Sequence, residues 1–195
     1  MSAQEMHKSM GLGLCLLVSL VTIAVMVKIG IDLNNIEFSV SPASASVLPT
    51  GESAPEFSLE DLDGNEVRLT DQRGQVVLVN FWATWCGPCL QELPHIQQIH
   101  EKYQDQGLVV LAISTDHQKS AVRPFVEKNG YTFPVLFVDE EVENVYQIRG
   151  IPVVYLIDRT GVIRFDKVGF CPGGEKEIER QVEQLLEEEM DIPLP

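Results

Sequence analysis

The stretch VVLVNFWATWCGPC, residues 76–89, determines the fold of this chain. It opens with apolar, mostly β-branched residues from Val76 to Val79, a run typical of a buried strand. After Cys86 and Cys89, apolar residues recur every three or four positions, as on one face of an amphipathic helix: Leu90, Leu93, Ile96, Ile99 and Tyr103. The two cysteines therefore lie where a buried strand leads into the start of a helix.

The start of a helix favours a reactive cysteine. Its unpaired N–H groups and the positive end of its dipole stabilise a thiolate, which is the nucleophilic form of the side chain. Cys86 comes first and is expected to be the more exposed, so we expect it to attack a substrate disulfide. Cys89, one turn deeper, would then resolve the mixed disulfide. The alternatives are a structural zinc site and a chance pair of cysteines, but the chain lacks the second ligand pair at suitable spacing that zinc would need.

The motif from Trp85 to Cys89, placed after an apolar strand, resembles the active site of the thioredoxin superfamily. The segment APEFSL, residues 54–59, resembles the opening of membrane-tethered TlpA/ResA-type proteins, and also that of peroxiredoxins. The resemblance covers about residues 51–190. It implies a thiol–disulfide oxidoreductase with a redox-active Cys86–Cys89 disulfide, and we expect no cofactor and no metal site.

The rest of the chain alternates strand and helix patterns, which favours an α/β fold with a mixed central sheet flanked by helices. The turn signal from Asp61 to Gly64, followed by a short alternating strand, predicts an N-terminal hairpin, and the resemblance adds a central αβ insertion between Ser114 and Val138. The predicted strands are Glu66 to Leu69, Leu108 to Ile113, Phe133 to Val138, Val153 to Ile157 and Val162 to Val168. The predicted helices beyond the cysteines are Lys119 to Lys128, Glu140 to Arg149 and Glu175 to Met190.

The resemblance also implies a substrate-binding surface around the cysteines. The proline that matches Pro152 is cis in thioredoxin-like proteins and faces the cysteine pair, and Ile151 before it would offer its backbone to a peptide substrate. Trp85 would flank the nucleophile on a flat apolar docking surface, to which we also assign Gly87 and Pro88.

Three further residues are candidates for tuning the cysteines. Asn80 departs from thioredoxin, which has a buried acid at this position, and is expected to hydrogen-bond the backbone inside the core. Glu92 matches a glutamate of ResA-type proteins and is a candidate catalytic residue that exchanges a proton with Cys89 or Cys86 if it is buried. A solvated carboxylate is the alternative for Glu92. Cys171 is either a half-buried bystander or an alternative disulfide partner of Cys86.

The N-terminal part of the chain is expected to anchor it in a membrane. Residues 10–27 carry no charge, and about 20 mostly apolar residues suffice to span a bilayer. We therefore expect a cytoplasmic stub and single-pass signal-anchor in residues 1–33, a flexible linker in 34–50, the thioredoxin-like domain in 51–190 and a C-terminal tail in 191–195. A cleaved signal peptide is the alternative.

The net charge of the chain and its resemblance to TlpA/ResA-type proteins indicate which partners to expect. The net charge of −15 argues against nucleic acid and is compatible with a monomer. The resemblance places the domain on the extracytoplasmic (periplasmic) side of the membrane. There it would reduce disulfides of envelope proteins, including apocytochrome c during cytochrome c biogenesis. A membrane thiol-electron donor would then reduce the domain's own disulfide again. A thiol peroxidase and a copper-delivery module that uses Cys86, Cys89 and a histidine are the alternatives.

Overall fold

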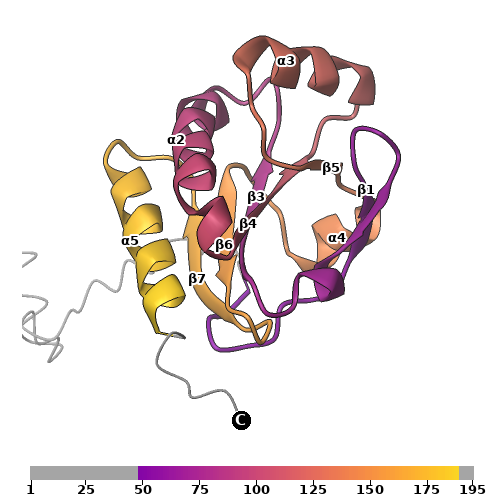
Figure 1. Ribbon diagram of the computed structural model, residues 1–195. Coiled ribbons are helices and arrows are strands. Elements are labelled where there is room, and N and C mark those ends of the chain that lie inside the picture. The colour runs from indigo at the N-terminus through magenta and orange to yellow at the C-terminus, as the bar shows by residue number, and fades with distance from the viewer. Residues whose placement is uncertain (1–47, 189–195) are drawn as a thin grey trace, which may run out of the picture. The chain divides into compact units, whose positions relative to one another are not determined.

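The computed structural model describes residues 48–188, and a mixed sheet forms the centre of this part of the chain (Figure 1). Its five strands have the order β5-β4-β3-β6-β7. β3 pairs in parallel with β4 and β4 in parallel with β5, whereas β6 is antiparallel to β3 and β7 to β6. The strands are β3 (Val76–Trp82), β4 (Leu108–Ser114), β5 (Val135–Phe137), β6 (Val153–Ile157) and β7 (Ile163–Val168). The predicted α/β class and mixed sheet are confirmed.

Strand β3 is the central strand, and all of its residues are buried. It has neighbours on both sides and is covered on both faces, so neither face needs polar side chains. This explains why the strand continues past the predicted Val79 to Trp82: Phe81 and Trp82 are fully buried core residues.

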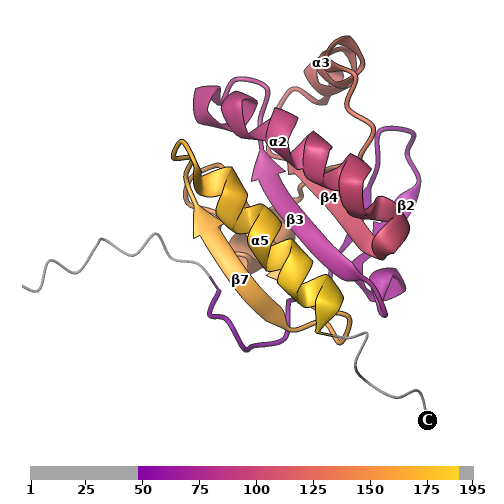
Figure 2. The same cartoon turned by 60° about the vertical axis from the view of Figure 1, so that its left-hand side comes forward.

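Helices α2 (Gly87–Tyr103) and α5 (Gly174–Glu187) lie side by side on one face of the sheet (Figure 2). Alternate residues of β3, including Leu78 and Trp82, face these helices because side-chain direction in a strand alternates. They pack in one cluster with Leu93 and Ile96 of α2 and with Ile178 and Val182 of α5.

The opposite face of the sheet is covered by the N-terminal hairpin and helix α4 (Glu140–Val145) (Figure 1). The hairpin consists of β1 (Ser58–Glu60) and β2 (Glu66–Arg68), paired antiparallel. Two buried tyrosines tie this layer together, since Tyr146 Oη donates to the Pro55 carbonyl at 2.6 Å and Tyr155 Oη to the Tyr146 carbonyl at 3.1 Å.

The predicted insertion is present between β4 and β5. It starts with a 3-10 turn, Lys119–Ala121, and continues as helix α3 (Val122–Asn129). The helix ends at Gly130, whose φ of 69° is a left-handed conformation that glycine adopts at little cost. Phe125 of α3 packs on the ring of Trp82, with centroids 5.5 Å apart, which joins the insertion to the end of the central strand.

Several predicted boundaries were wrong. The helix predicted to run to Arg149 ends at Val145, because Gln147 takes a left-handed φ of 55°. Leu69 does not extend β2, since it starts a 3-10 turn that buries its side chain. The strand predicted at 133–138 is confined to Val135–Phe137.

The predicted membrane anchor, nearly all of the linker and the C-terminal tail lie outside the described residues. Between residues 48 and 188, no helix combines the length and the apolar character that crossing a bilayer requires.

We expect Tyr146→Phe to lower the free energy of unfolding by about 1–3 kcal/mol, because it leaves the Pro55 carbonyl without its buried donor. Urea denaturation measures the change. Tyr131→Phe is the control, since it removes the same hydroxyl group from a tyrosine that is only half-buried. Equal losses in the two variants would contradict the role given to the Tyr146 hydrogen bond.

Candidate active site

Cys86 and Cys89 are joined by a disulfide at the start of α2. Cys86 is the residue that caps the helix, and its Sγ accepts a hydrogen bond from the Cys89 N–H at 3.2 Å. Cys86 is 5% exposed and Cys89 is fully buried, so Cys86 is the outer cysteine, in the order expected from the sequence. The sulfur of Cys86 therefore lies in the field of the helix N-terminus, which stabilises a thiolate once the disulfide is opened.

The Ile151–Pro152 peptide bond is cis, as predicted, and it lies beside the cysteine pair. The Ile151 carbonyl oxygen is 3.8 Å from Cys86 Sγ. The Pro152 carbonyl accepts a hydrogen bond from the Gly169 N–H at 2.8 Å, which holds the start of β6 against the chain that leaves β7. The loop before β6 thus forms one wall of the cysteine site.

The residues that flank Cys86 in the sequence are exposed and largely apolar. Trp85 is 67% exposed, and Gly87 and Pro88 are exposed as well. Trp82, three residues earlier, is instead buried in the core. An exposed tryptophan next to a reactive residue is suited to contact a partner protein, because its ring provides a large apolar area.

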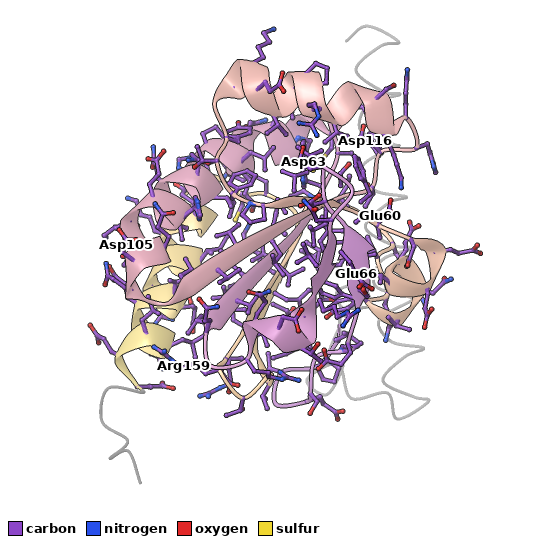
Figure 3. All side chains as sticks on the ribbon, turned by 45° about the vertical axis from the view of Figure 1, so that its right-hand side comes forward. Glu60, Asp63, Glu66, Asp105, Asp116 and Arg159 are labelled. Atoms are coloured by element: carbon purple, nitrogen blue, oxygen red, sulfur yellow. A yellow bond between two sulfur atoms is a disulfide. The ribbon has the colours of Figure 1, made fainter. Side chains whose placement is uncertain are left out.

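Asp116, which sequence reasoning missed, holds the loop that leads to Cys86. Its Oδ1 accepts from the Thr84 hydroxyl at 2.6 Å, and its Oδ2 accepts from the Thr84 N–H at 2.9 Å and the Ser114 hydroxyl at 2.9 Å. Figure 3 shows Asp116 far from the exposed Asp105. The only signal in the sequence is the polar run Ser-Thr-Asp directly after a buried strand, which does not reveal its partner across the sheet.

Glu92 lies on α2 one turn beyond Cys89 and is buried, with 1% of its surface exposed. Its Oε1 forms an ion pair with Lys167 Nζ at 2.7 Å, and its Oε2 accepts from Asn80 Nδ2 at 3.1 Å. The alternative of a solvated carboxylate was therefore wrong. The expected backbone bond of Asn80 was also wrong, since its amide group binds the Glu92 carboxylate instead.

The environment of Glu92 has opposing effects on its pKa. Burial raises the pKa of Glu92, and this outweighs the lowering by the Lys167 ammonium and the Asn80 amide. The protonated form of Glu92 is therefore accessible at a higher pH than for an ordinary carboxyl group. Lys167 was missed because a lysine in the alternating pattern of an edge strand normally indicates a solvent-facing side chain.

Cys171 is an exposed, free cysteine in the loop after β7. The expectation of a half-buried side chain was therefore wrong. A Cβ built on Gly174 would lie 2.9 Å from both Cys171 Sγ and Lys167 Cε, so the thiol lies near Lys167. Its proposed disulfide with Cys86 is not formed here, since Cys86 pairs with Cys89.

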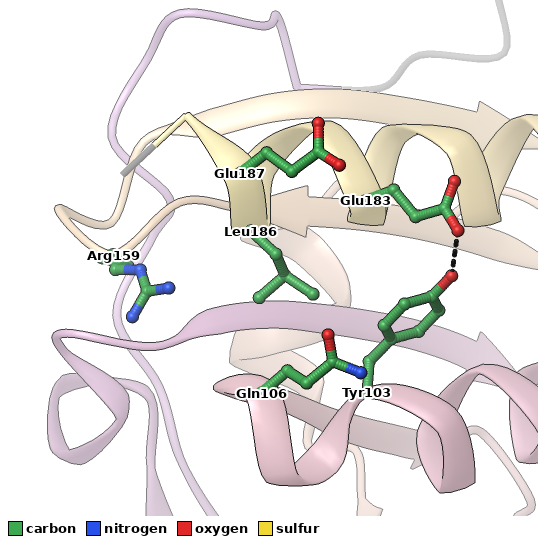
Figure 4. Close-up of a pocket in the computed structure, with 6 residues that line it drawn as sticks. All are labelled: Tyr103, Gln106, Arg159, Glu183, Leu186 and Glu187. Carbon is green, nitrogen blue, oxygen red and sulfur yellow. Dashed lines mark hydrogen bonds between the residues drawn. The ribbon is translucent and has the colours of Figure 1, made fainter. Parts of the chain in front are cut away.

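One cavity lies apart from the cysteines. A cavity of about 430 Å³ is lined by Tyr103, at the end of α2 far from Cys86, and by residues of α5 and the Arg159 turn (Figure 4). Within residues 48–188, no cluster of three His, Cys, Asp or Glu side chains could hold a metal ion.

Comparisons with known proteins agree with this geometry. A model of the AhpC/TSA family matches residues 50–166. The thiol-disulfide oxidoreductase ResA of Geobacillus kaustophilus is 36% identical over 141 residues, covering 72% of this chain and 80% of that protein. The thioredoxin-like protein YneN of Bacillus subtilis is 38% identical over 135 residues, 68% of this chain and 78% of YneN. A crystal structure of a candidate thiol:disulfide interchange protein DsbE from Chlorobium tepidum has a TM-score of 0.68 and 35% identity, covering 71% of this chain and 99% of that one.

Fold, cysteine pair and relatives define one class, the thioredoxin-like thiol–disulfide oxidoreductases, and this protein is a member of that class. More closely, the chain belongs to the AhpC/TSA family and is similar to ResA over 72% of its length.

We expect Asp116→Ala to reduce stability by about 1–3 kcal/mol, because it leaves the partly buried Thr84 N–H without its acceptor. Amide hydrogen exchange should become faster at Thr84 and Trp85, and urea denaturation measures the loss. Asp105→Ala is the control, since Asp105 is an exposed aspartate. Unchanged exchange at Thr84 in Asp116→Ala would show that the loop is held by other contacts.

Proposed function

We propose that this protein reduces disulfides of other proteins by dithiol–disulfide exchange, with Cys86 as nucleophile and Cys89 as resolving cysteine. The observation that carries the proposal is the Cys86–Cys89 disulfide at the start of α2, with the outer sulfur capping the helix. The reducing direction is supported by the Gly-Pro pair between the cysteines, which is that of thioredoxin at the reducing end of the known range.

The exchange proceeds in two balanced steps. The Cys86 thiolate attacks one sulfur of the substrate disulfide, the substrate S–S bond breaks, and the leaving thiolate takes a proton from water. Cys89 then attacks Cys86 Sγ, which forms the Cys86–Cys89 bond and releases the second substrate sulfur. Two electrons have passed from the protein to the substrate, and an incoming dithiol must return them before the next cycle.

A substrate would bind along the surface that surrounds Cys86. Trp85, Gly87 and Pro88 provide an exposed apolar contact on one side. On the other side, the backbone of Ile151 before cis Pro152 lies close to Cys86 Sγ and would pair with an extended segment of the substrate. Binding through backbone groups favours an unfolded or flexible protein substrate over a small molecule.

Glu92 is the proposed proton acceptor for Cys89. It lies one turn from Cys89 on the same helix and is buried, so water does not compete for the proton. Because burial raises its pKa, Glu92 can also return the proton when the disulfide is opened again.

We propose further that the protein is anchored in the cytoplasmic membrane with its domain on the extracytoplasmic side. The uncharged residues 10–27 and the similarity to ResA support this location. Its substrates would then be disulfide-bearing envelope proteins, including apocytochrome c, and a membrane thiol-electron donor would recharge it.

In cells, we expect Cys89→Ser to accumulate mixed disulfides between Cys86 and substrate proteins, because the resolving thiol is absent. Non-reducing electrophoresis and mass spectrometry identify the trapped proteins, with Cys86→Ser/Cys89→Ser as the control. Trapped envelope proteins support both the activity and the location. Trapped cytosolic proteins would contradict the location, and rapid reduction of hydrogen peroxide without any trapping would contradict the activity.

We expect Glu92→Gln to flatten the pH dependence of the resolving step. In the unaltered protein, the rate of resolution should rise with pH as Glu92 becomes ionised. Because the pKa of Glu92 is raised, this rise lies above the pH range of an ordinary carboxyl group. Glutamine does not ionise, so the rise should be absent in the variant. Stopped-flow measurements of mixed-disulfide resolution test this, with the exposed Glu101→Gln on the same helix as the control. An unaltered profile in Glu92→Gln would remove Glu92 from the mechanism.

A further inference from the structure

Lys167 makes an unusual ion pair for a lysine at the edge of a sheet. Its side chain is only 12% exposed and that of Glu92 only 1%, with 2.7 Å between Nζ and Oε1. The Arg180–Glu177 pair on α5 is typical of the surface by comparison, with side chains 56% and 46% exposed. Lys167 Nζ also donates to the Gly169 carbonyl at 2.8 Å and lies 5.7 Å from the centre of the Phe170 ring, so its position is defined by several contacts.

A buried ion pair of this kind adds little to stability, because the loss of hydration of both charges offsets their attraction. Its larger effect is on protonation. An ammonium group within about 4–6 Å of a carboxyl group favours the ionised form. Lys167 therefore partly offsets the effect of burial on the pKa of Glu92, which would be raised further without this cation.

Asn80 adds a second property to this arrangement. Its Nδ2 donates to the Glu92 carboxylate, while its Oδ1 is buried and has no partner among the described residues. If the amide group rotates by half a turn, Oδ1 can accept a hydrogen bond from the protonated Glu92. An asparagine thus offers a partner to both protonation states of Glu92, which an ionised aspartate cannot do.

We propose that Lys167 is a positioning residue that sets the protonation of Glu92, with Asn80 as the neighbour that accommodates both states. This inference rests on the proposed role of Glu92. During resolution, the proton of the Cys89 thiol passes to Glu92 while Cys89 Sγ bonds to Cys86 Sγ, and the substrate sulfur leaves as a thiolate. When an incoming dithiol reduces the disulfide, Glu92 returns that proton to the Cys89 thiolate.

The charged groups that face Glu92 come from two elements. Lys167 belongs to β7, and His95, whose positive form also lowers the pKa of Glu92, belongs to α2. Asn80 of β3 contributes a dipole and no charge. Lys167 is the only one of the three that is both cationic and in direct contact with the Glu92 carboxylate, so its replacement should have the largest effect.

The test measures the pKa of Glu92 directly, by ¹³C NMR of labelled glutamate carboxyl groups in the full-length, oxidised protein. In Lys167→Met the pKa of Glu92 should rise by at least about one unit, because the opposing cation is lost. Lys167→Arg keeps the positive charge, so the pKa of Glu92 should stay close to that in the unaltered protein. Lys102→Met is the matched control, since Lys102 forms an exposed ion pair with Glu179. An unchanged pKa of Glu92 in Lys167→Met would overturn the proposal.

The kinetic consequence separates this inference from the proposed function. The pH midpoint of the resolving step should move upward in Lys167→Met by the same amount as the pKa, and Lys167→Met should have no such effect in a Glu92→Gln background. If Lys167→Met fails to fold, Lys167→Gln replaces it; it also removes the charge and should raise the pKa of Glu92 in the same direction. If the pKa of Glu92 shifts but the resolving step does not change, the effect of Lys167 on Glu92 stands. The proposed role of Glu92 in the exchange reaction is then wrong.

Discussion

The hydrogen bond from the Cys89 N–H to Cys86 Sγ is the interaction on which the site depends. It exists because the chain passes from the central strand β3 into helix α2 within a few residues, so that the first cysteine caps the helix and the second lies inside it. A sulfur at this place is stabilised as an anion by the backbone N–H groups and the dipole of the helix N-terminus. This stabilisation of the Cys86 thiolate is therefore a property of the fold rather than of a particular side chain.

The register of the sheet brings the other parts of the site to the same edge. Trp82 at the end of β3 pairs with Ser114 at the end of β4, and Phe81 pairs with Val153 at the start of the antiparallel β6. Val153 in turn pairs with Val168 at the end of β7. Four strand ends thus meet beside Cys86, which explains why Asp116, cis Pro152 and Lys167 lie near it although they are distant in the sequence.

Burial gives the Glu92–Lys167–Asn80 group its chemical character. On the surface, water would screen the pair and the carboxyl group would titrate normally. Between α2 and the sheet, desolvation and the ammonium act on the same carboxyl group in opposite directions. Burial has the larger effect, so the result is a carboxyl group with a raised pKa, one turn from Cys89 on α2.

The sequence by itself was sufficient to predict the α/β class, the junction of strand and helix at Cys86, and the cis bond before Pro152. Each of these follows from local patterns or from a motif that resembles a known family. Only the tertiary structure decided the partners of Glu92 and Asn80, the clamp of Asp116 on Thr84 and the burial of Lys167. These depend on contacts between residues up to 75 positions apart, as for Lys167 and Glu92, and no local pattern encodes such contacts. Strand pairing and helix packing determine these contacts, because they decide which side chains are buried together.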